Sequence, residues 1–145
     1  MTVRLSGPPP EATRLDQRLL ERRAQRVLRA LGHAGSELSL SIVDDVEIQQ
    51  LNREYRGRPQ ATDVLSFSLV EGSQREFRGS LLGDVVVSLE TAAAQARSAH
   101  RGLDEAVAKL VIHGVLHLLG HDHEADDEAR VMQREERRLW AMLRS

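Results

Sequence analysis

The feature that most constrains the fold is the segment 104–119, DEAVAKLVIHGVLHLL, which as a helix is apolar around almost its whole circumference. A helix that is apolar on every side must be buried among other elements, because water would otherwise contact its surface. We therefore expect this helix at the centre of the molecule, with the other elements packed around it.

The rest of the chain predicts one small sheet surrounded by helices. Apolar residues recur at helical spacing from Leu15 to Leu31, on one side of a short helix through Ile48, Leu51 and Tyr55, and along 126–143. An alanine-rich helix is expected to begin at Ser88. Strands are predicted at 2–5, 38–43, 62–69 and 81–88, the last with Val85 to Val87 buried on both faces. At 145 residues the chain fits one domain, 1–145, of the α+β class.

The composition limits the chemistry of any functional site. The chain contains no cysteine, so thiolate nucleophiles and Cys-containing zinc ribbons are excluded. A metal would be held by nitrogen and oxygen ligands. The near-neutral net charge of −2 argues against a broad non-specific nucleic-acid coat. We find neither a long apolar span nor an apolar signal segment near residue 1, and expect a cytoplasmic protein without a membrane partner.

Four of the six histidines lie within residues 113–123, HGVLHLLGHDH. His113 and His117 are four residues apart, so a helix places both rings on one face. Gly120 can end that helix in a left-handed conformation and return the chain to the same face, where His123 would supply a third nitrogen. Three imidazoles with an open fourth position are typical of catalytic zinc. The prediction is one zinc ion on His113, His117 and His123.

The residues next to these histidines have more limited expected roles. His121 is left out of the ligand set, because it lies two residues before His123. Asp122 and Glu124 either orient ligand imidazoles or cap the next helix. Gly114 takes the place of the glutamate base in the metalloprotease pattern HExxH. A glycine in mid-helix costs about 1 kcal/mol relative to alanine, so this position needs a small residue, either for close packing or for access to the metal.

The segment HGVLHLLGHDH resembles the signature of the YbeY family of bacterial metal-dependent endoribonucleases, also called rRNA maturation factors. Three other segments agree: LNREYRGRPQATDVLSF, LLGDVVVS and EADDEARVMQREE, so the resemblance covers roughly residues 45 to 136 in order. It implies an α+β fold with a mixed sheet of about four strands. It also assigns His113, His117 and His123 as zinc ligands.

The resemblance further implies that Arg56 is catalytic and contacts phosphate, a suitable role for a planar guanidinium. Asp63 and Ser66, in the matching strand, are expected at most to support the residues of this site. The implied activity is single-strand RNA cleavage in 3′-end maturation of 16S rRNA and in ribosome quality control. Zinc would polarise the phosphate or activate water. The expected partners are rRNA precursor and small-subunit assembly proteins, and no DNA.

Two alternative functions remain open at the level of sequence. One is a non-enzymatic ribosome assembly factor in which zinc only stabilises the fold. The other is a metalloprotease, which Gly114 disfavours. Aromatic residues that could stack on bases are few, namely Tyr55, Phe67, Phe77 and Trp140, so the sequence gives no support for recognition by stacking.

Overall fold

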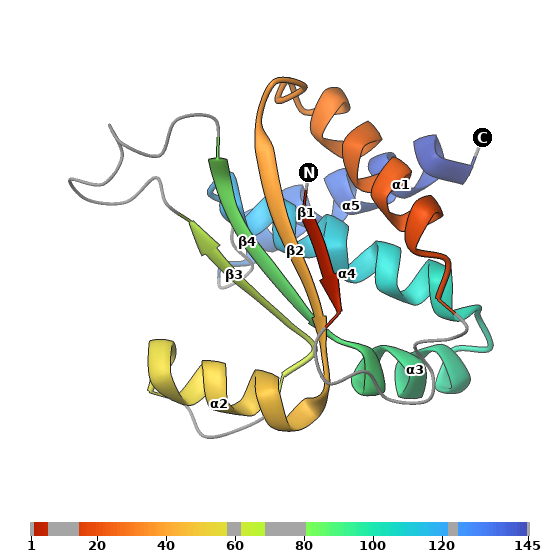
Figure 1. Ribbon diagram of the computed structural model, residues 1–145. Coiled ribbons are helices and arrows are strands. Elements are labelled where there is room, and N and C mark those ends of the chain that lie inside the picture. The colour runs from red at the N-terminus through yellow and green to blue at the C-terminus, as the bar shows by residue number, and fades with distance from the viewer. Residues whose placement is uncertain (1, 6–14, 58–61, 69–80, 122–124, 145) are drawn as a thin grey trace.

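The computed structural model describes residues 2–5, 15–57, 62–68, 81–121 and 125–144. Within these ranges the chain forms four strands and five helices (Figure 1). In chain order they are β1 (Thr2–Leu5), α1 (Gln17–Ala30), β2 (Glu37–Val43), α2 (Asp45–Arg56), β3 (Val64–Ser68), β4 (Leu81–Ser88), α3 (Leu89–Ser98), α4 (Leu103–Leu118) and α5 (Asp126–Arg144). None of the described helices is long and apolar enough to cross a bilayer.

The described strands form one mixed sheet in the order β1-β2-β4-β3. β1, β2 and β4 run parallel, and β3 pairs antiparallel with β4. Together with the helices around it, this sheet confirms the predicted α+β class.

Helices cover both faces of the sheet, with α2 on one side and α1, α4 and α5 on the other (Figure 1). Successive valines of β4 divide between the two sides. Val85 and Val87 pack into the larger core with α1 and α4, whereas Val86 packs with Ile48 of α2. This confirms that β4 is buried on both faces.

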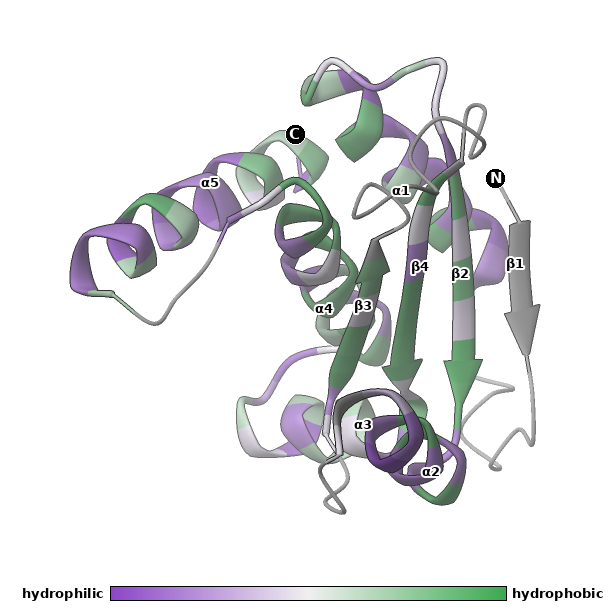
Figure 2. Ribbon diagram, turned by 90° about the vertical axis from the view of Figure 1, so that its left-hand side faces the viewer, coloured by the Kyte–Doolittle hydropathy of each residue, from purple (hydrophilic) through white to green (hydrophobic). Residues whose placement is uncertain are grey.

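α4 is the central helix that its all-round apolar sequence predicts. It contacts β3, β4, α1, α3 and α5, and most of its residues between Ala106 and Leu118 are buried. In Figure 2 the ribbon of α4 is largely green beside the sheet, whereas α5 shows long purple stretches. α5 contributes buried Met132, Leu139 and Leu143.

Two details differ from the sequence-based prediction. α1 begins at Gln17 and not at Leu15, because Asp16 accepts a hydrogen bond from the Leu19 amide (3.0 Å) and so caps the helix. Tyr55 does not share the buried face of Ile48. Its side chain lies in the last turn of α2, is 67% exposed, and forms an edge-type contact with the Phe67 ring at a centroid distance of 5.3 Å.

Candidate metal centre and adjoining groove

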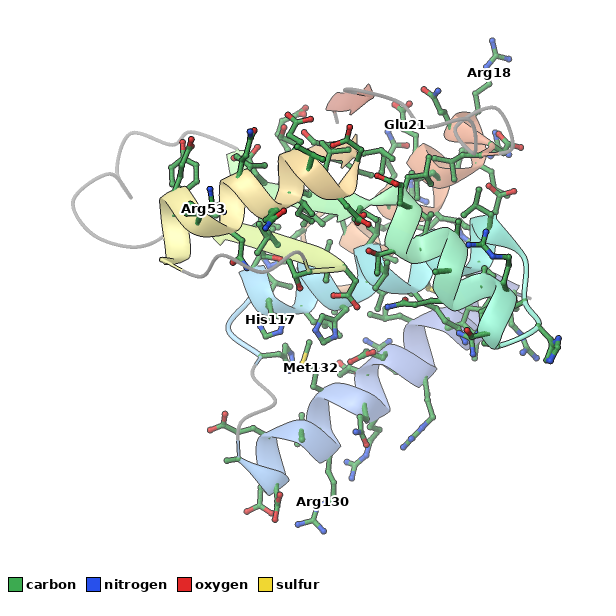
Figure 3. The ribbon with its side chains drawn as sticks, turned by 90° about the horizontal axis from the view of Figure 1, so that it is seen from below. Arg18, Glu21, Arg53, His117, Arg130 and Met132 are labelled. Atoms are coloured by element: carbon green, nitrogen blue, oxygen red, sulfur yellow. The ribbon has the colours of Figure 1, made fainter. Side chains whose placement is uncertain are left out.

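His113 and His117 lie on the same face of α4, as their spacing predicts. Their ring centroids are 4.7 Å apart with an interplanar angle of 71°. Both residues are partly exposed, at the side of α4 that faces α5, where Figure 3 shows His117 beside Met132. Because a zinc–nitrogen bond is about 2.0–2.1 Å long, two rings at this separation are close enough to share one ion.

Glu136 of α5 fixes the orientation of the His113 ring. The Nδ1 atom of His113 lies 3.2 Å from Glu136 Oε1. An ionised carboxylate only accepts hydrogen bonds, so in the neutral imidazole Nδ1 carries the proton and Nε2 carries the lone pair that a metal requires. Sequence reasoning missed Glu136. Its position four residues after the inward-facing Met132 could have placed it on the same face of α5.

A Schellman motif ends α4 at Gly120 and His121. Gly120 has a φ of +96°, its amide donates to the His117 carbonyl (3.0 Å), and the His121 amide donates to the Leu116 carbonyl (3.0 Å). The predicted left-handed turn at Gly120 is therefore confirmed. Residues 122–124, which include the predicted ligand His123 and the candidates Asp122 and Glu124, lie outside the described residues.

Gly114 lets α4 approach the sheet closely. A Cβ atom built there would lie 2.7 Å from Val85 Cγ1, 3.1 Å from Ser66 Oγ and 3.2 Å from Val64 Cγ2. Ser66 Oγ donates a hydrogen bond to the Gly114 carbonyl over 2.8 Å. Close packing thus accounts for the small residue between the two histidine turns, and Ser66 ties β3 to α4 at this point.

An open groove of about 610 Å³ begins at His113 and runs between α3, α4 and α5. Asp63 lies at its wall, where its Oδ2 atom accepts a hydrogen bond from Gln95 Nε2 (3.1 Å). Arg101 and Lys109 bring positive charge to the groove, and Glu136 brings negative charge. The groove therefore presents both signs of charge beside the histidines.

Arg56 is the last residue of α2, and Gly57 follows it in the left-handed conformation with a φ of +67°. The structure describes the backbone of Arg56, while its side chain lies outside the described part. The predicted phosphate contact of Arg56 therefore stays a prediction.

No three His, Asp or Glu side chains among the described residues are grouped so that they could hold a metal ion. Two imidazoles on one helical face, one of them hydrogen-bonded to a carboxylate, nevertheless fit part of a zinc site whose ligands are oriented by neighbouring groups. A third ligand would have to come from elsewhere, such as residues 122–124.

Comparison with known proteins points to one family. The model of a family described as "Endoribonuclease YbeY" matches residues 10–144. A protein named Endoribonuclease YbeY from Anaeromyxobacter sp. (strain Fw109-5) is 49% identical over 139 residues, 96% of this chain and 70% of that protein. The protein of that name from Syntrophotalea carbinolica is 46% identical over 127 residues, 86% of this chain and 85% of the relative.

One solved structure resembles the fold. The solution structure of TM1509 from Thermotoga maritima superposes with a TM-score of 0.58 at 24% sequence identity, covering 99% of this chain and 92% of that one.

Proposed function

Because this chain belongs to the endoribonuclease YbeY family, we propose that it is a zinc-dependent hydrolase that cleaves single-stranded RNA. We further propose that its cellular role is 3′-end maturation of 16S rRNA, within ribosome biogenesis and quality control. The observation that carries the chemical proposal is the pair of imidazoles on α4, with Glu136 hydrogen-bonded to His113.

His113 and His117 would hold the zinc ion, with His123 as the third ligand. Zinc, when bound, supplies a Lewis acid that neutralises negative charge on a phosphate oxygen. Glu136 would keep the proton of His113 on Nδ1, so that Nε2 would be the ligating atom. Arg56 would contact the non-bridging oxygens of the phosphate and stabilise the charge that develops during cleavage.

The absence of a carboxylate at position 114 separates this site from a metalloprotease. The metalloprotease pattern needs a glutamate directly after the first histidine, whereas here Gly114 packs against Val85. No side chain at that position can act as a base. The proposal is therefore phosphodiester cleavage and not peptide hydrolysis.

The first experiment measures cleavage of single-stranded RNA by wild type and Arg56→Ala at equal zinc content. Arg53→Ala is the matched control, because Arg53 is an exposed arginine in the last two turns of the same helix (Figure 3). We expect Arg56→Ala to lose about 100-fold or more in rate, as loss of a transition-state contact does, and Arg53→Ala to cleave normally. An Arg56→Ala protein as active as wild type would remove Arg56 from the mechanism.

Zinc content tests the ligand set separately. His113→Ala and His117→Ala should purify without zinc and without activity, whereas His100→Asn should retain both. His100 is exposed, does not line the groove and has a φ of +53°, a conformation that asparagine tolerates. An active, zinc-containing His117→Ala protein would refute the assignment.

The role in rRNA maturation is tested on precursor 16S rRNA within small-subunit particles. Metal-dependent shortening of the 3′ end supports the proposed role. Tight binding to the particles without any cleavage would instead favour the non-enzymatic assembly factor.

A further inference from the structure

A pocket next to the metal centre contains the only tryptophan of the chain, Trp140. The pocket measures about 210 Å³ and lies between α4 and α5. Its lining residues are Lys109, Ile112, Gln133, Glu136, Arg137 and Trp140. Lys109 and Glu136 also line the groove that begins at His113, so the pocket and the histidines adjoin one continuous surface.

The register of α4 against α5 places this pocket one helical turn from His113. On α4, Lys109 precedes His113 by four residues, and on α5, Trp140 follows Glu136 by four residues. His113 therefore faces Glu136, and Lys109 faces Trp140. His113 Nδ1 lies 3.2 Å from Glu136, and Lys109 Nζ lies 5.4 Å from the Trp140 ring centroid. One turn of helix is about 5.4 Å along the axis, so the pocket borders the proposed metal centre.

Positive charge surrounds the half-buried Trp140 ring. Arg23 Cζ lies 5.2 Å from its centroid, Lys109 approaches within 5.4 Å, and Arg137 lines the same pocket. Ile112, which is buried, lies beneath the pocket. A partly exposed indole ring with cations over it, next to Arg137, matches the chemistry of a nucleotide, whose base has two π-faces and whose phosphate is anionic.

Lys109 can turn toward a phosphate at little cost. Its Nζ atom is 3.3 Å from Glu105 Oε2, a carboxylate that Arg101 also approaches at 3.7 Å. The Lys109 side chain is 34% exposed, and a partly exposed ion pair of this kind contributes little to stability. Glu105 would keep its second cationic neighbour if Lys109 moved.

We propose that the pocket at Trp140 is a subsite for one nucleotide of a single-stranded RNA, adjacent to the scissile phosphate. The base contacts the Trp140 ring where Lys109 leaves it, while Lys109 contacts the neighbouring phosphate. The pocket is smaller than the roughly 300–1,000 Å³ of sites for drug-sized ligands, which suits one base and not a folded RNA element. This inference rests on the proposed endoribonuclease function, and it identifies a positioning subsite within that function.

Trp140 itself reports occupancy, because no other tryptophan contributes to the fluorescence of the protein. The experiment mixes the zinc-loaded full chain with hexauridylate and records Trp140 emission before turnover, at several salt concentrations. We expect quenching that saturates with RNA. Lys109→Gln should weaken binding and lower the slope of log Kd against log salt by about 0.7, the value for one lost phosphate contact on a single strand. Lys109→Arg should restore the slope.

Steady-state cleavage gives the second readout. Trp140→Leu should raise KM by about five- to 150-fold, the range for loss of one stacked base, with zinc content unchanged. Trp140→Phe should recover part of that loss. Arg130→Gln is the control, because exposed Arg130 lies in the first turns of α5 beside Asp127 (Figure 3) and does not line the pocket, and it should match wild type in every assay.

The outcomes separate the subsite from the proposed function. Metal-dependent cleavage with no Trp140 quenching, and with wild-type KM in both Lys109→Gln and Trp140→Leu, would overturn the subsite and leave the endoribonuclease intact. Quenching with the expected salt slope but without cleavage would retain the subsite and overturn the enzymatic function. Absence of both would overturn both.

Discussion

At the scale of single residues, neighbours from other elements decide what each residue of the candidate site can do. His113 is a suitable ligand because Glu136, 23 positions later, holds its Nδ1 proton. Gly114 lies in the same turn, and its missing side chain makes room for Val85 and Ser66 of the sheet. Two adjacent residues of one helix thus face different partners, one toward α5 and the other toward β3 and β4.

Removing the Glu136 carboxylate should weaken zinc binding. Partners that orient a ligand imidazole typically contribute about 10- to 100-fold to metal affinity, and we expect a loss in that range for Glu136→Ala in competition with a chromogenic chelator. Glu135→Ala is the matched control, because Glu135 pairs with Arg138 and not with His113. Equal zinc affinity in both variants would contradict the orienting role of Glu136.

A methyl group at position 114 should destabilise the protein. The added Cβ would lie 2.7 Å from Val85 Cγ1, and overpacking of this kind costs about 1–3 kcal/mol. Better helix propensity offsets about 1 kcal/mol of that cost, so we expect a net loss of about 1 kcal/mol for Gly114→Ala in urea unfolding. Gly35→Ala, where a Cβ meets no atom within 4 Å, should not lower stability. A Gly114→Ala protein as stable as wild type would show that the sheet yields to the methyl group.

At the scale of elements, residues at the starts of helices form hydrogen bonds that join neighbouring elements. Asp16 caps α1, and its amide donates to Asp104 of α4 over 2.8 Å. Ser88 ends β4 and caps α3 by accepting from the Thr91 amide (3.2 Å), while its hydroxyl donates to Asp45 of α2. Thr91 donates to the same carboxylate over 2.8 Å. The starts of α2 and α3 are thereby joined at the end of the sheet.

Removing the Ser88 hydroxyl should lower the stability of the protein more than removing an ordinary helix cap does. Ser88 is fully buried, with 0% exposure, so Ser88→Ala leaves buried polar groups without their partner, at a cost of about 1–3 kcal/mol. We expect that loss in chemical denaturation. Ser98→Ala, at the exposed end of α3, should change stability by about 0.5 kcal/mol or less. Similar values for the two variants would refute the structural role of Ser88.

One acid on α5 should titrate below its ordinary range. The hydrogen bond from Arg138, at 2.6 Å to Nε, lowers the pKa of Glu135, and the nearby charges of Arg138 and His121 add to this effect. A lowered folded-state pKa gives stability that is present above the ordinary glutamate pKa and is lost as the pH falls through the folded-state value. Carboxyl NMR titration should show the pKa of Glu135 rising in Arg138→Gln. An unchanged pKa would mean that Arg138 does not hold the carboxylate in solution.

At the scale of the whole molecule, α4 connects the sheet to α5, and the proposed metal would add a further connection between α4 and the chain beyond Gly120. A ligand that binds only the folded state stabilises it by about 2.7 kcal/mol at 100 times its Kd. For a chain of this size each kcal/mol shifts Tm by about 2–4 °C. Bound zinc should therefore raise Tm by about 5–10 °C.

Removing zinc with a chelator tests this expected rise in Tm. EDTA should lower the Tm of wild type and His100→Asn by that amount and leave the Tm of His117→Ala unchanged. A wild-type Tm that does not respond to EDTA, although zinc is shown to leave the protein, would mean that the metal does not stabilise the fold.

The sequence by itself determined which segments form helices and strands, where most of them end, and that His113 and His117 share a face. These features depend on periodicity, capping and glycine turns, which act over a few neighbouring residues. Only the tertiary structure decided that Glu136 contacts His113, that Lys109 meets Trp140 one turn away, and that Val85 requires a glycine at 114. Those contacts depend on the register of α4 against α5 and against the sheet, which is set by the packing of whole apolar faces. No local pattern specifies that register, so the sequence alone could not place Trp140 beside Lys109 and Glu136.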